Sequence, residues 1–238
     1  MGNVLILGAK GYVADSLINH LETRHKLKCI DREQNNNGID HDFTQIDVSD
    51  AEQFREYLIS INDDDFPDFL INLSGHIISR ALLETLINDK HSFKIDLIAH
   101  LKDFGENLDC QVIPMLVYSE ELIKRRKKGR VINFSSLNSK GVFGQFGYSS
   151  AKATIEAMTK NLALELGIHG IQANCISPGY LNLPNLLQNM NDNGINRAIQ
   201  QSALKKLVDV KDVCLAVDFL MSTSGVSGTT IQVHSSIG

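Results

Sequence analysis

The sequence has no tryptophan, only four prolines and four cysteines among 238 residues, and no apolar run that approaches the roughly 20 residues of a membrane span. It has no low-complexity tract, and its 43 % hydrophobic and 21 % charged residues are typical of a globular chain rather than a disordered one. No charged leader or cleavage site precedes the first apolar residues. We therefore expect a cytoplasmic protein with neither a targeting segment nor a membrane partner.

The cysteines form no Cys-x-x-Cys pair and show no histidine spacing typical of a zinc site. Each lies in an apolar context, which predicts small core residues with free thiols and no metal. A reducing compartment fits this pattern. The residues are Cys29, Cys110, Cys175 and Cys214.

The sequence has no basic arm apart from one run, residues 124–130, and the formal net charge is -5. That run precedes an apolar strand, so we interpret it as the end of a helix, where cations suit the helix dipole. A nucleic-acid surface would need further basic clusters and aromatic platforms, which the sequence lacks. No nucleic-acid partner is expected.

Short apolar runs typical of strands alternate with helix-length segments along the chain. Continuous apolar strands separated by helices predict a parallel sheet covered on both faces, here a single doubly wound Rossmann-type α/β domain over residues 1–238. The runs are 4–7, 27–30, 69–73, 131–134, 171–176 and 230–233, and a weaker one at 42–46 makes the mostly parallel sheet seven-stranded. The Asn- and Gln-rich segment 180–206 is interpreted as irregular, and it is a candidate substrate lid over the carboxyl edge of the sheet.

The first strand leads directly into a glycine-containing turn and then an amphipathic segment, residues 15–22. Gly8 and Gly11 allow a sharp turn and a close approach to a pyrophosphate, which would rest on the helix N-terminus, and Ala14 allows close helix packing. A plain tight turn is the alternative. The candidate cofactor residues of this turn are Gly8, Lys10, Gly11, Tyr12 and Val13.

Asp31 ends the second predicted strand, at about the 20-residue distance from the glycine turn where an acidic residue accepts hydrogen bonds from an adenosine ribose. Such a carboxylate repels a 2′-phosphate, so NAD is favoured as the cofactor. Lys10 and Arg32 are cations that could instead reach a 2′-phosphate, and they leave NADP open.

Tyr148 and Lys152 are four residues apart in a segment rich in helix formers that ends at Gly167. This spacing puts both side chains on one helix face, where the ammonium can lower the pKa of the phenol and make it a proton shuttle. A half-buried Tyr beside a solvated Lys is the plain alternative. Ser136 precedes the pair at the end of a predicted strand, with Ser135 as its rival on the opposite strand face.

Taken together, these motifs resemble the short-chain dehydrogenase/reductase family over nearly the whole chain. Beside the glycine turn, Asp47 and Val48 match the family's acidic element near the adenine, and Asn72-Leu73-Ser74-Gly75 stands where the family has Asn-Asn-Ala-Gly along the cofactor cleft. The resemblance implies cofactor contacts from Asp47, Val48, Leu73, Ser74, Gly75, Tyr148, Lys152, Pro178 and Gly179. It also implies a catalytic tetrad of Asn107, Ser136, Tyr148 and Lys152.

The sequence departs from the family pattern in several places. The glycine turn is one residue shorter than the commonest form, Leu7 replaces a Thr before it, and the Thr expected after Pro-Gly is absent around Leu183. His234-Ser235-Ser236 replaces Asp-Gly-Gly, and residues 76–102 match nothing in the family. We interpret His76 as structural rather than as a base, and we expect Asp96, His100 and Asp103 to form a solvated helix face.

The resemblance implies an NAD(P)-dependent oxidoreductase that interconverts a secondary alcohol and a ketone, with Tyr148 as acid and base. Two alternatives stay open: an epimerase or dehydratase of a nucleotide-linked sugar, which the shorter glycine turn favours, and a regulatory protein that binds the cofactor without turnover. The polar lid candidate favours a hydroxylated or sugar-like small molecule as substrate. By resemblance we expect a homodimer or homotetramer, paired through helices that begin near Gly105 and Tyr148.

Overall fold

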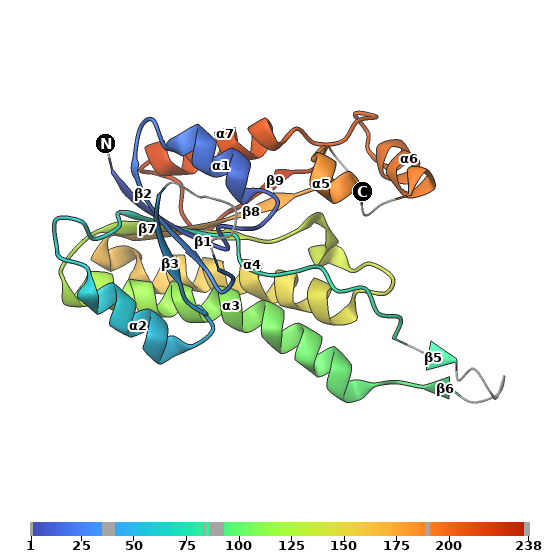
Figure 1. Ribbon diagram of the computed structural model, residues 1–238, viewed down its shortest axis with the longest axis horizontal. Helices are drawn as coiled ribbons and strands as arrows, with labels where there is room; N and C mark the ends of the chain where they lie inside the picture. The colour runs from blue at the N-terminus through green and yellow to red at the C-terminus, as the bar shows by residue number, and fades with distance from the viewer. Residues whose placement is uncertain (1, 35–40, 83, 86–92, 189–190, 236–238) are drawn as a thin grey trace.

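The computed structural model describes residues 2–34, 41–82, 84–85, 93–188 and 191–235 (Figure 1). Its centre is a seven-stranded parallel sheet in the order β3-β2-β1-β4-β7-β8-β9. The strands are β1 Asn3–Leu7, β2 Lys26–Asp31, β3 Asp42–Gln45, β4 Phe69–Asn72, β7 Gly129–Phe134, β8 Ile171–Pro178 and β9 Thr230–Val233. All seven predicted strands, the weak one included, are confirmed.

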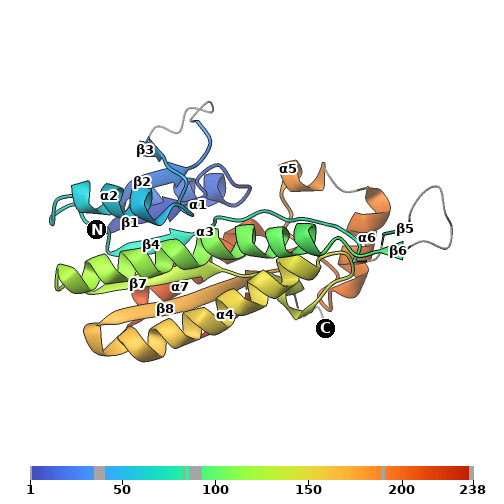
Figure 2. The same cartoon turned by 90° about the horizontal axis from the view of Figure 1, so that it is seen from below.

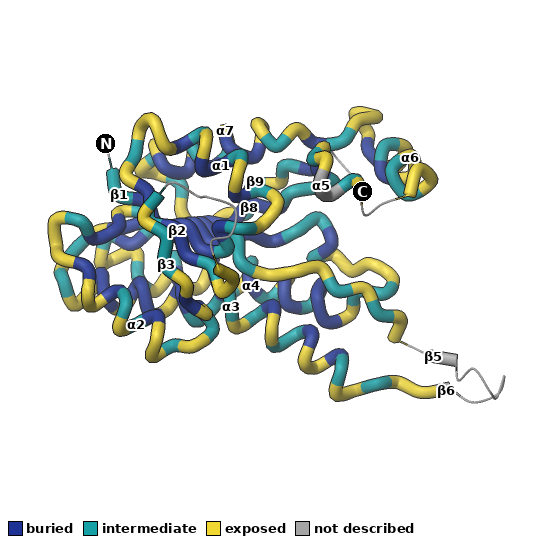
Figure 3. Tube along the Cα trace, in the orientation of Figure 1, coloured by how far each residue is buried: buried dark blue, intermediate teal, exposed yellow. Residues whose placement is uncertain are grey.

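Helices cover both faces of this sheet. On one face lie α1 (Ala14–Leu21) and α7 (Val210–Ser222), and on the other lie α2 (Ala51–Ser60), α3 (Leu97–Lys124) and α4 (Phe146–Leu166) (Figure 1). Each layer encloses its own apolar cluster, because the strand side chains alternate between the two faces. The buried centre of the sheet stands out in Figure 3. The predicted doubly wound Rossmann-type architecture is confirmed.

Local residue chemistry sets the ends of the helices. The carboxylates of Asp50, Asp96 and Asp209 accept backbone hydrogen bonds at the starts of α2, α3 and α7. At the other end, α3 stops at Lys124 inside the basic run, as predicted. The Arg125 guanidinium then donates hydrogen bonds to the carbonyls of Leu58 and Ile61 and stabilises the contact between α3 and α2.

The segment 180–206 is more ordered than expected, because it contains α5 (Pro184–Leu187) and α6 (Asp192–Gln201). The Asn191 side chain caps α6 by accepting from the Gly194 amide, so part of the polar composition serves helix capping. The two ends of the segment are held together where Leu181 forms a β-bridge with Val208 and the Asn182 amide donates to the Val208 carbonyl at 2.8 Å. Residues 189–190 lie outside the described residues.

The segment 76–102 matched no known pattern, and its residues 76–82 lead away from the main sheet (Figure 1). The segment includes a short antiparallel pair, β5 (Glu84–Thr85) and β6 (Phe93–Lys94), beyond the end of the sheet (Figure 2). The following helix, α3, begins at Leu97 rather than near Gly105, because Asp96 already supplies a cap.

All four cysteines are free thiols; Cys29, Cys175 and Cys214 are buried and Cys110 is partly buried. Among the described residues, no group of His, Cys, Asp and Glu side chains is arranged to hold a metal ion. Within the same ranges no helix has the length and apolar character needed to cross a membrane.

Candidate active site

The candidate residues gather at the carboxyl ends of the parallel strands. The strand order reverses between β1 and β4, since the chain continues from β1 toward β3 on one side and from β4 toward β9 on the other. In open parallel sheets such a reversal leaves a crevice above the strand ends, where ligands bind. The segments that follow β1, β2, β4, β7 and β8 therefore share one edge.

The glycine turn is closely packed against the segment after β4. Gly8 has a φ of +71°, and a Cβ on it would lie 2.8 Å from the Ser74 backbone nitrogen and 2.9 Å from the Leu73 carbonyl carbon. The Gly11 amide donates to the Gly8 carbonyl at 3.0 Å and closes the turn. Helix α1 begins three residues later at Ala14, which is fully buried. A glycine at position 8 is therefore required by both backbone conformation and space.

Asp31 ends β2 beside this turn. Its Oδ2 accepts from the Lys10 amide and its Oδ1 from the Glu33 amide, each at 3.0 Å. The Lys10 ammonium points away to the Gln34 carbonyl at 2.6 Å and lies 3.7 Å from the Glu33 carboxylate. The site thus contains two carboxylates, and one of its two candidate cations is already paired. Arg32 is exposed.

Asp47 and Val48 follow β3 at the same edge. The Asp47 carboxylate accepts from the Ser49 amide at 3.0 Å and from the Ser49 hydroxyl at 2.6 Å, which fixes a turn before α2. Val48 is buried in the core under α2, whereas Asp47 is exposed at the rim. In the glycine turn, Tyr12 is half exposed and Val13 packs against the core beneath α1.

The segment Leu73-Ser74-Gly75 is held by side chains of neighbouring elements. The Leu73 amide donates to the Leu7 carbonyl, and the Ser74 amide donates to the Asn72 carboxamide, both at 3.0 Å. Gln111 on α3 fastens the same segment from below, since its amide nitrogen donates to the Ser74 carbonyl at 2.6 Å and to the Asn72 carbonyl at 3.1 Å. Sequence reasoning missed Gln111; its amide chemistry on the buried face of α3 was the available signal.

Asn107 and Lys152 come from two different helices and approach the same point. A Cβ on Gly75, whose φ is +121°, would lie 3.2 Å from Asn107 Oδ1 and 3.4 Å from Lys152 Nζ. Asn107 is fully buried; its Oδ1 accepts from the His76 amide and its Nδ2 donates to the Asp103 carbonyl, each at 3.1 Å. The Lys152 ammonium donates to the Phe134 carbonyl at 2.8 Å.

Tyr148 lies in the first turn of α4 and is almost fully buried, and the Ser136 side chain is close enough to act on the pKa of its phenol. The Lys152 ammonium lies 5.8 Å from the centre of the Tyr148 ring. Ser136, Tyr148, Lys152 and Asn107 therefore form one chain of neighbours from the strand end to α3.

The two serines after β7 have different partners. The Ser135 hydroxyl is buried and bonds to Glu156 Oε1 at 2.5 Å and to the Lys152 carbonyl at 3.1 Å. The Ser136 hydroxyl accepts from the Asn138 amide at 3.2 Å and meets Tyr148. Ser135 thus connects β7 to α4, whereas Ser136 lies near the phenol, and the two side chains point to opposite sides as strand alternation requires. Glu156, one turn beyond Lys152, was not among the expected residues.

The electrostatics of the Tyr–Lys pair differ from the sequence expectation. Burial raises the pKa of Tyr148, and the hydrogen bond from Ser136 offsets only part of that increase. Burial also lowers the pKa of Lys152. Lys152 does not contribute to the direction of this pKa shift: its ammonium donates to the Phe134 carbonyl and lies 5.8 Å from the centre of the Tyr148 ring.

Pro178 and Gly179 end β8 at the same edge and pack against the C-terminal segment. A Cβ on Gly179 would lie 2.8 Å from the Cα of His234, so His234 is placed directly against this turn. His234 is buried and Ser235 has a positive φ of 55°. Ser236 lies outside the described residues.

Two polar residues of α3 are buried, which corrects the expectation of a solvated face. His100 and Asp103 are 3 % and 6 % exposed, whereas Asp96 is partly exposed. They are covered because Gly147 lets α4 come close: a Cβ there would lie 2.8 Å from the His100 carbonyl and 2.9 Å from the Asp103 Cβ. Asp103 accepts from the Arg80 Nε at 3.2 Å. His76 is exposed, and its ring lies 3.7 Å from Glu106.

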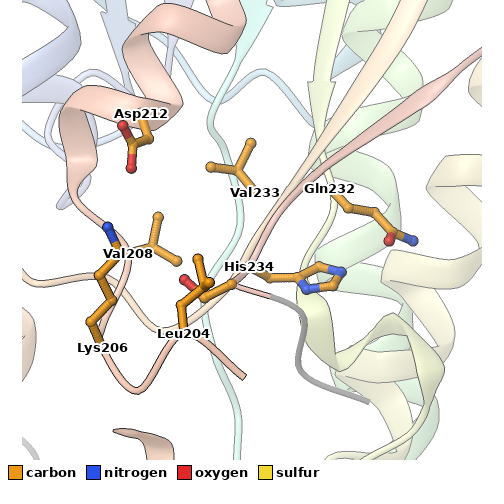
Figure 4. A pocket seen from close by; sticks show the side chains of 8 residues that line it. Leu204, Lys206, Val208, Asp212, Gln232, Val233 and His234 are labelled. Atoms are coloured by element: carbon orange, nitrogen blue, oxygen red, sulfur yellow. The ribbon is translucent and has the colours of Figure 1, made fainter. Parts of the chain in front are cut away.

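Among the described residues lie hollows of about 310 Å³ at two places, and neither of these is lined by Ser136 or Tyr148. The first lies beside the end of β9, and its lining includes Val233, His234, Leu204, Val208 and Asp212 (Figure 4). The second lies beside the first turn of α4.

The geometry defines a class first. The sheet is doubly wound and parallel, the turn after β1 has room only for glycine at position 8, and a carboxylate ends β2. Together these features form a site that fits a dinucleotide. Beside it lie the buried side chains of Tyr148, Lys152 and Asn107 and the partly buried Ser136, which include groups able to transfer a proton. This combination is that of a nucleotide-dependent oxidoreductase.

Comparison with known proteins agrees. Residues 18–235 match the family model of enoyl-(acyl carrier protein) reductases. The chain is 32 % identical to nodulation protein G of Azospirillum brasilense over 193 residues, which cover 79 % of this chain and 73 % of that protein. It is 23 % identical to the 3-oxoacyl-[acyl-carrier-protein] reductase of Vibrio harveyi over 197 residues, 79 % of this chain and 74 % of that one.

The fold is similar to a short-chain dehydrogenase from Leptospira borgpetersenii with bound NAD⁺, with a TM-score of 0.84 at 24 % identity over 99 % of this chain and 92 % of that one. The chain belongs to the short-chain dehydrogenase/reductase family.

Proposed function

We propose that the protein interconverts a secondary alcohol and a ketone with a nicotinamide cofactor, preferably NAD, and that Tyr148 is its acid and base. The observation that carries this proposal is the buried phenol of Tyr148, which has the Ser136 side chain on one side and the Lys152 ammonium 5.8 Å from the centre of its ring. The name of the Vibrio harveyi relative describes reduction of a 3-oxo group, which is the same kind of chemistry.

Bound at the strand ends, the cofactor supplies or accepts the hydride at the reacting carbon. In the reducing direction Tyr148 donates the phenol proton to the carbonyl oxygen, and the product is the alcohol. In the oxidising direction the phenolate of Tyr148 takes up the hydroxyl proton. Ser136 holds the same oxygen through its hydroxyl while negative charge develops. Burial keeps Tyr148 protonated at neutral pH, which suits the reducing direction.

Lys152 and Asn107 restore the proton on Tyr148 in this proposal. Lys152 is buried and anchored to the Phe134 carbonyl, so its ammonium has a fixed position near the phenol ring. Asn107, whose side chain also lies near Gly75, donates to the Asp103 carbonyl on α3 and accepts from the His76 amide after Gly75. In this proposal Asn107 anchors a water that links Lys152 to solvent near His76, which lies at the surface.

The preference for NAD rests on the charges around Asp31. Both of its carboxylate oxygens are fixed by backbone amides, and the Lys10 ammonium is paired with Glu33 and Gln34. A 2′-phosphate placed here would meet two carboxylates. The residues proposed to contact the cofactor are Gly8, Lys10, Gly11, Tyr12, Val13, Asp31, Arg32, Asp47, Val48, Leu73, Ser74, Gly75, Tyr148, Lys152, Pro178 and Gly179.

The segment 180–206 is proposed as a lid of this single domain. Its ends meet at the Leu181–Val208 bridge, while α5 and α6 lie beyond the ends of the strands (Figure 1). Their polar composition favours a polar, hydroxylated substrate.

We propose a homodimer or homotetramer paired through α3 and α4. Both helices carry exposed apolar side chains, Leu116 and Ile123 on α3 and Leu164 on α4, which a partner would cover. Light scattering on the purified protein would give the oligomeric state.

The test is a screen of secondary alcohols and ketones with NAD(H) and NADP(H), followed on the best substrate by Tyr148→Phe. This change keeps the ring and removes the acid, so turnover should fall by about 100-fold or more. Net change in NAD(H) distinguishes a dehydrogenase from an epimerase, which returns the hydride to its substrate.

Tyr57→Phe is the matched control, because it removes a phenol hydroxyl on α2 outside the candidate site. It should leave turnover unchanged. Turnover of Tyr148→Phe close to that of the unaltered protein would refute the assignment, and cofactor binding without turnover across the panel would favour a regulatory protein.

A further inference from the structure

The hollow beside the first turn of α4 is lined by both polar and apolar side chains. The extended segment that carries Arg80 and Leu82 forms one wall, and the loop at Val142 and Phe143 with the first turn of α4 forms the other. The Arg80 amide donates to the Gly144 carbonyl at 2.6 Å, and Arg80 forms a β-bridge with Gln145. The segment that carries Arg80 is thus docked on the loop that joins Ser136 to Tyr148.

Arg80 brings a positive charge to this hollow. Its Nε donates to Asp103 at 3.2 Å, and among the residues that the structure describes its two terminal nitrogens have no hydrogen-bond acceptor. The side chain is 38 % exposed. A guanidinium held by its Nε in this way still presents terminal N–H groups in a plane that suits a carboxylate.

Two buried polar atoms in the same place lack a partner. Ser149 lines the hollow and is only 6 % exposed, yet its hydroxyl has no hydrogen-bond partner among the described residues. His100 Nε2 is also buried without a partner, and its ring packs edge-on against Phe146, which lines the hollow. An unsatisfied buried hydroxyl costs about 1–3 kcal/mol, so such atoms indicate a missing polar partner.

The backbone amides in the first turn of α4 are further hydrogen-bond donors beside the hollow. Its cap residue Gln145 makes no side-chain hydrogen bond to the first turn, so the amides there are left to other acceptors. The positive end of the helix dipole favours an anion at this position.

The remaining walls are apolar and open to solvent. Phe143 is 93 % exposed, and Leu82, Val142 and Phe146 are also exposed. A ligand that only paired with Arg80 would leave these side chains in water. Their position favours a ligand that has an apolar chain next to its charged group.

This hollow opens on a different side of α4 from the catalytic pair. Successive helix residues are turned by about 100°, so Phe146 and Ser150, which line the hollow, point away from Tyr148 and Lys152. A ligand here would bind without competing for the Tyr148 hydroxyl, but it would contact the loop that positions Ser136 and Tyr148.

We propose that this hollow binds the carboxylate of a small amphipathic acid, with the carboxylate on Arg80 and Ser149 and the apolar chain on Phe143 and Phe146. Asp103 already offsets part of the Arg80 charge, so a carboxylate with one negative charge fits better than a phosphate with two. The ligand is a second molecule, distinct from the substrate of the proposed reaction.

The test is calorimetric titration of the full-length protein with octanoate, and with 1-octanol as the neutral probe of equal chain length. Octanoate should bind and 1-octanol should bind at least about tenfold more weakly, since it lacks the charge-assisted contacts. Arg80→Gln should weaken octanoate binding by about tenfold or more, and Ser149→Ala by a few-fold. Val142→Trp, which fills the hollow without changing its charge, should abolish binding.

Lys140→Gln is the matched control, because it removes an exposed positive charge close by that does not line the hollow. Its affinity for octanoate should stay within about twofold of the unaltered protein. Equal affinity across all variants, or no octanoate binding to the unaltered protein, would overturn the proposal. Competitive inhibition of turnover by octanoate would also overturn it, since the site would then be the substrate's. Binding is measured without turnover, so the result is independent of the proposed reaction.

Discussion

Replacing Asn107 tests whether this residue serves only the stability of the fold or also the proposed reaction. Its carboxamide joins the Asp103 carbonyl on α3 to the His76 amide after Gly75, through two hydrogen bonds of 3.1 Å. Asn107→Ala removes both bonds and leaves the partly buried His76 amide without a protein acceptor. The cost of such a loss is about 1–3 kcal/mol. For a chain of 150–250 residues, about 2 kcal/mol corresponds to a Tm decrease of roughly 4–8 °C.

The same substitution should reduce kcat beyond its effect on stability. Asn107 Oδ1 and Lys152 Nζ both approach the position of a Gly75 Cβ, so Asn107 fixes the surroundings of the proposed proton path. Gln111→Ala is the matched control, because Gln111 is also a fully buried amide on α3 and holds the same segment through the Asn72 and Ser74 carbonyls. It should lower the Tm by a similar amount and leave kcat nearly unchanged.

The assays are thermal unfolding by circular dichroism and kcat over a range of pH, measured at a temperature at which both variants are folded. Asn107→Ala should lower kcat and shift its pH profile, whereas Gln111→Ala should change only the Tm. Equal losses of kcat in the two variants, with unchanged pH profiles, would show that Asn107 acts only as a structural residue.

Three further predictions concern the cofactor turn and the proton donor. Asp31→Ala should lower kcat/KM for NAD by about 10- to 100-fold and that for NADP by less, because a charged hydrogen-bond acceptor is worth about 1.5–3 kcal/mol; an unchanged NAD to NADP ratio would contradict this. Gly8→Ala should destabilise the protein by at least about 1–2 kcal/mol in urea unfolding, since a Cβ at a φ of +71° would lie 2.8 Å from the Ser74 backbone nitrogen; Gly225→Ala, which meets no atom within 4 Å, is the control. Burial raises the pKa of Tyr148 in the folded protein above the value of about 10 that a phenol has in the unfolded chain. The protonated phenol therefore contributes to the stability of the fold below a pH of about 10, and this contribution is lost as the pH rises through the pKa of the folded protein. The oxidation rate should accordingly increase with pH into the alkaline range while the reduction rate stays level through neutral pH, and an oxidation rate already level at pH 7 would refute it.

The sheet could be predicted because each strand is a continuous apolar run, and even the weak strand β3 was identified from its place in the alternation. The pair β5 and β6 could not, since each strand has only two residues and carries no periodicity. The helices α5 and α6 were missed for another reason. Asn191 and its neighbours are residues typical of loops, and here one of them caps a helix.

The candidate site was predictable at the level of motifs, and its electrostatics were not. Tyr148 and Lys152 do share a helix face, but the spacing alone does not show that both are buried or that the ammonium bonds to Phe134. Burial therefore shifts the pKa of Tyr148 upward, opposite to the expectation. His100 and Asp103 show the same limit, since helix periodicity identifies a polar face without showing what packs on it.

Gly147 explains why the motif alone could not define the site. Asn107 belongs to α3 and Lys152 to α4, so their meeting at Gly75 depends on the distance between these helices. Near Tyr148 that distance is set by Gly147, where a Cβ would lie 2.8 Å from the His100 carbonyl and 2.9 Å from the Phe104 amide nitrogen. Any larger side chain must push α4 away from α3 and carry Tyr148 with it. The geometry of the proposed proton path therefore depends on how closely α3 and α4 pack. Gly147, the residue before Tyr148, permits this close packing because it has no side chain.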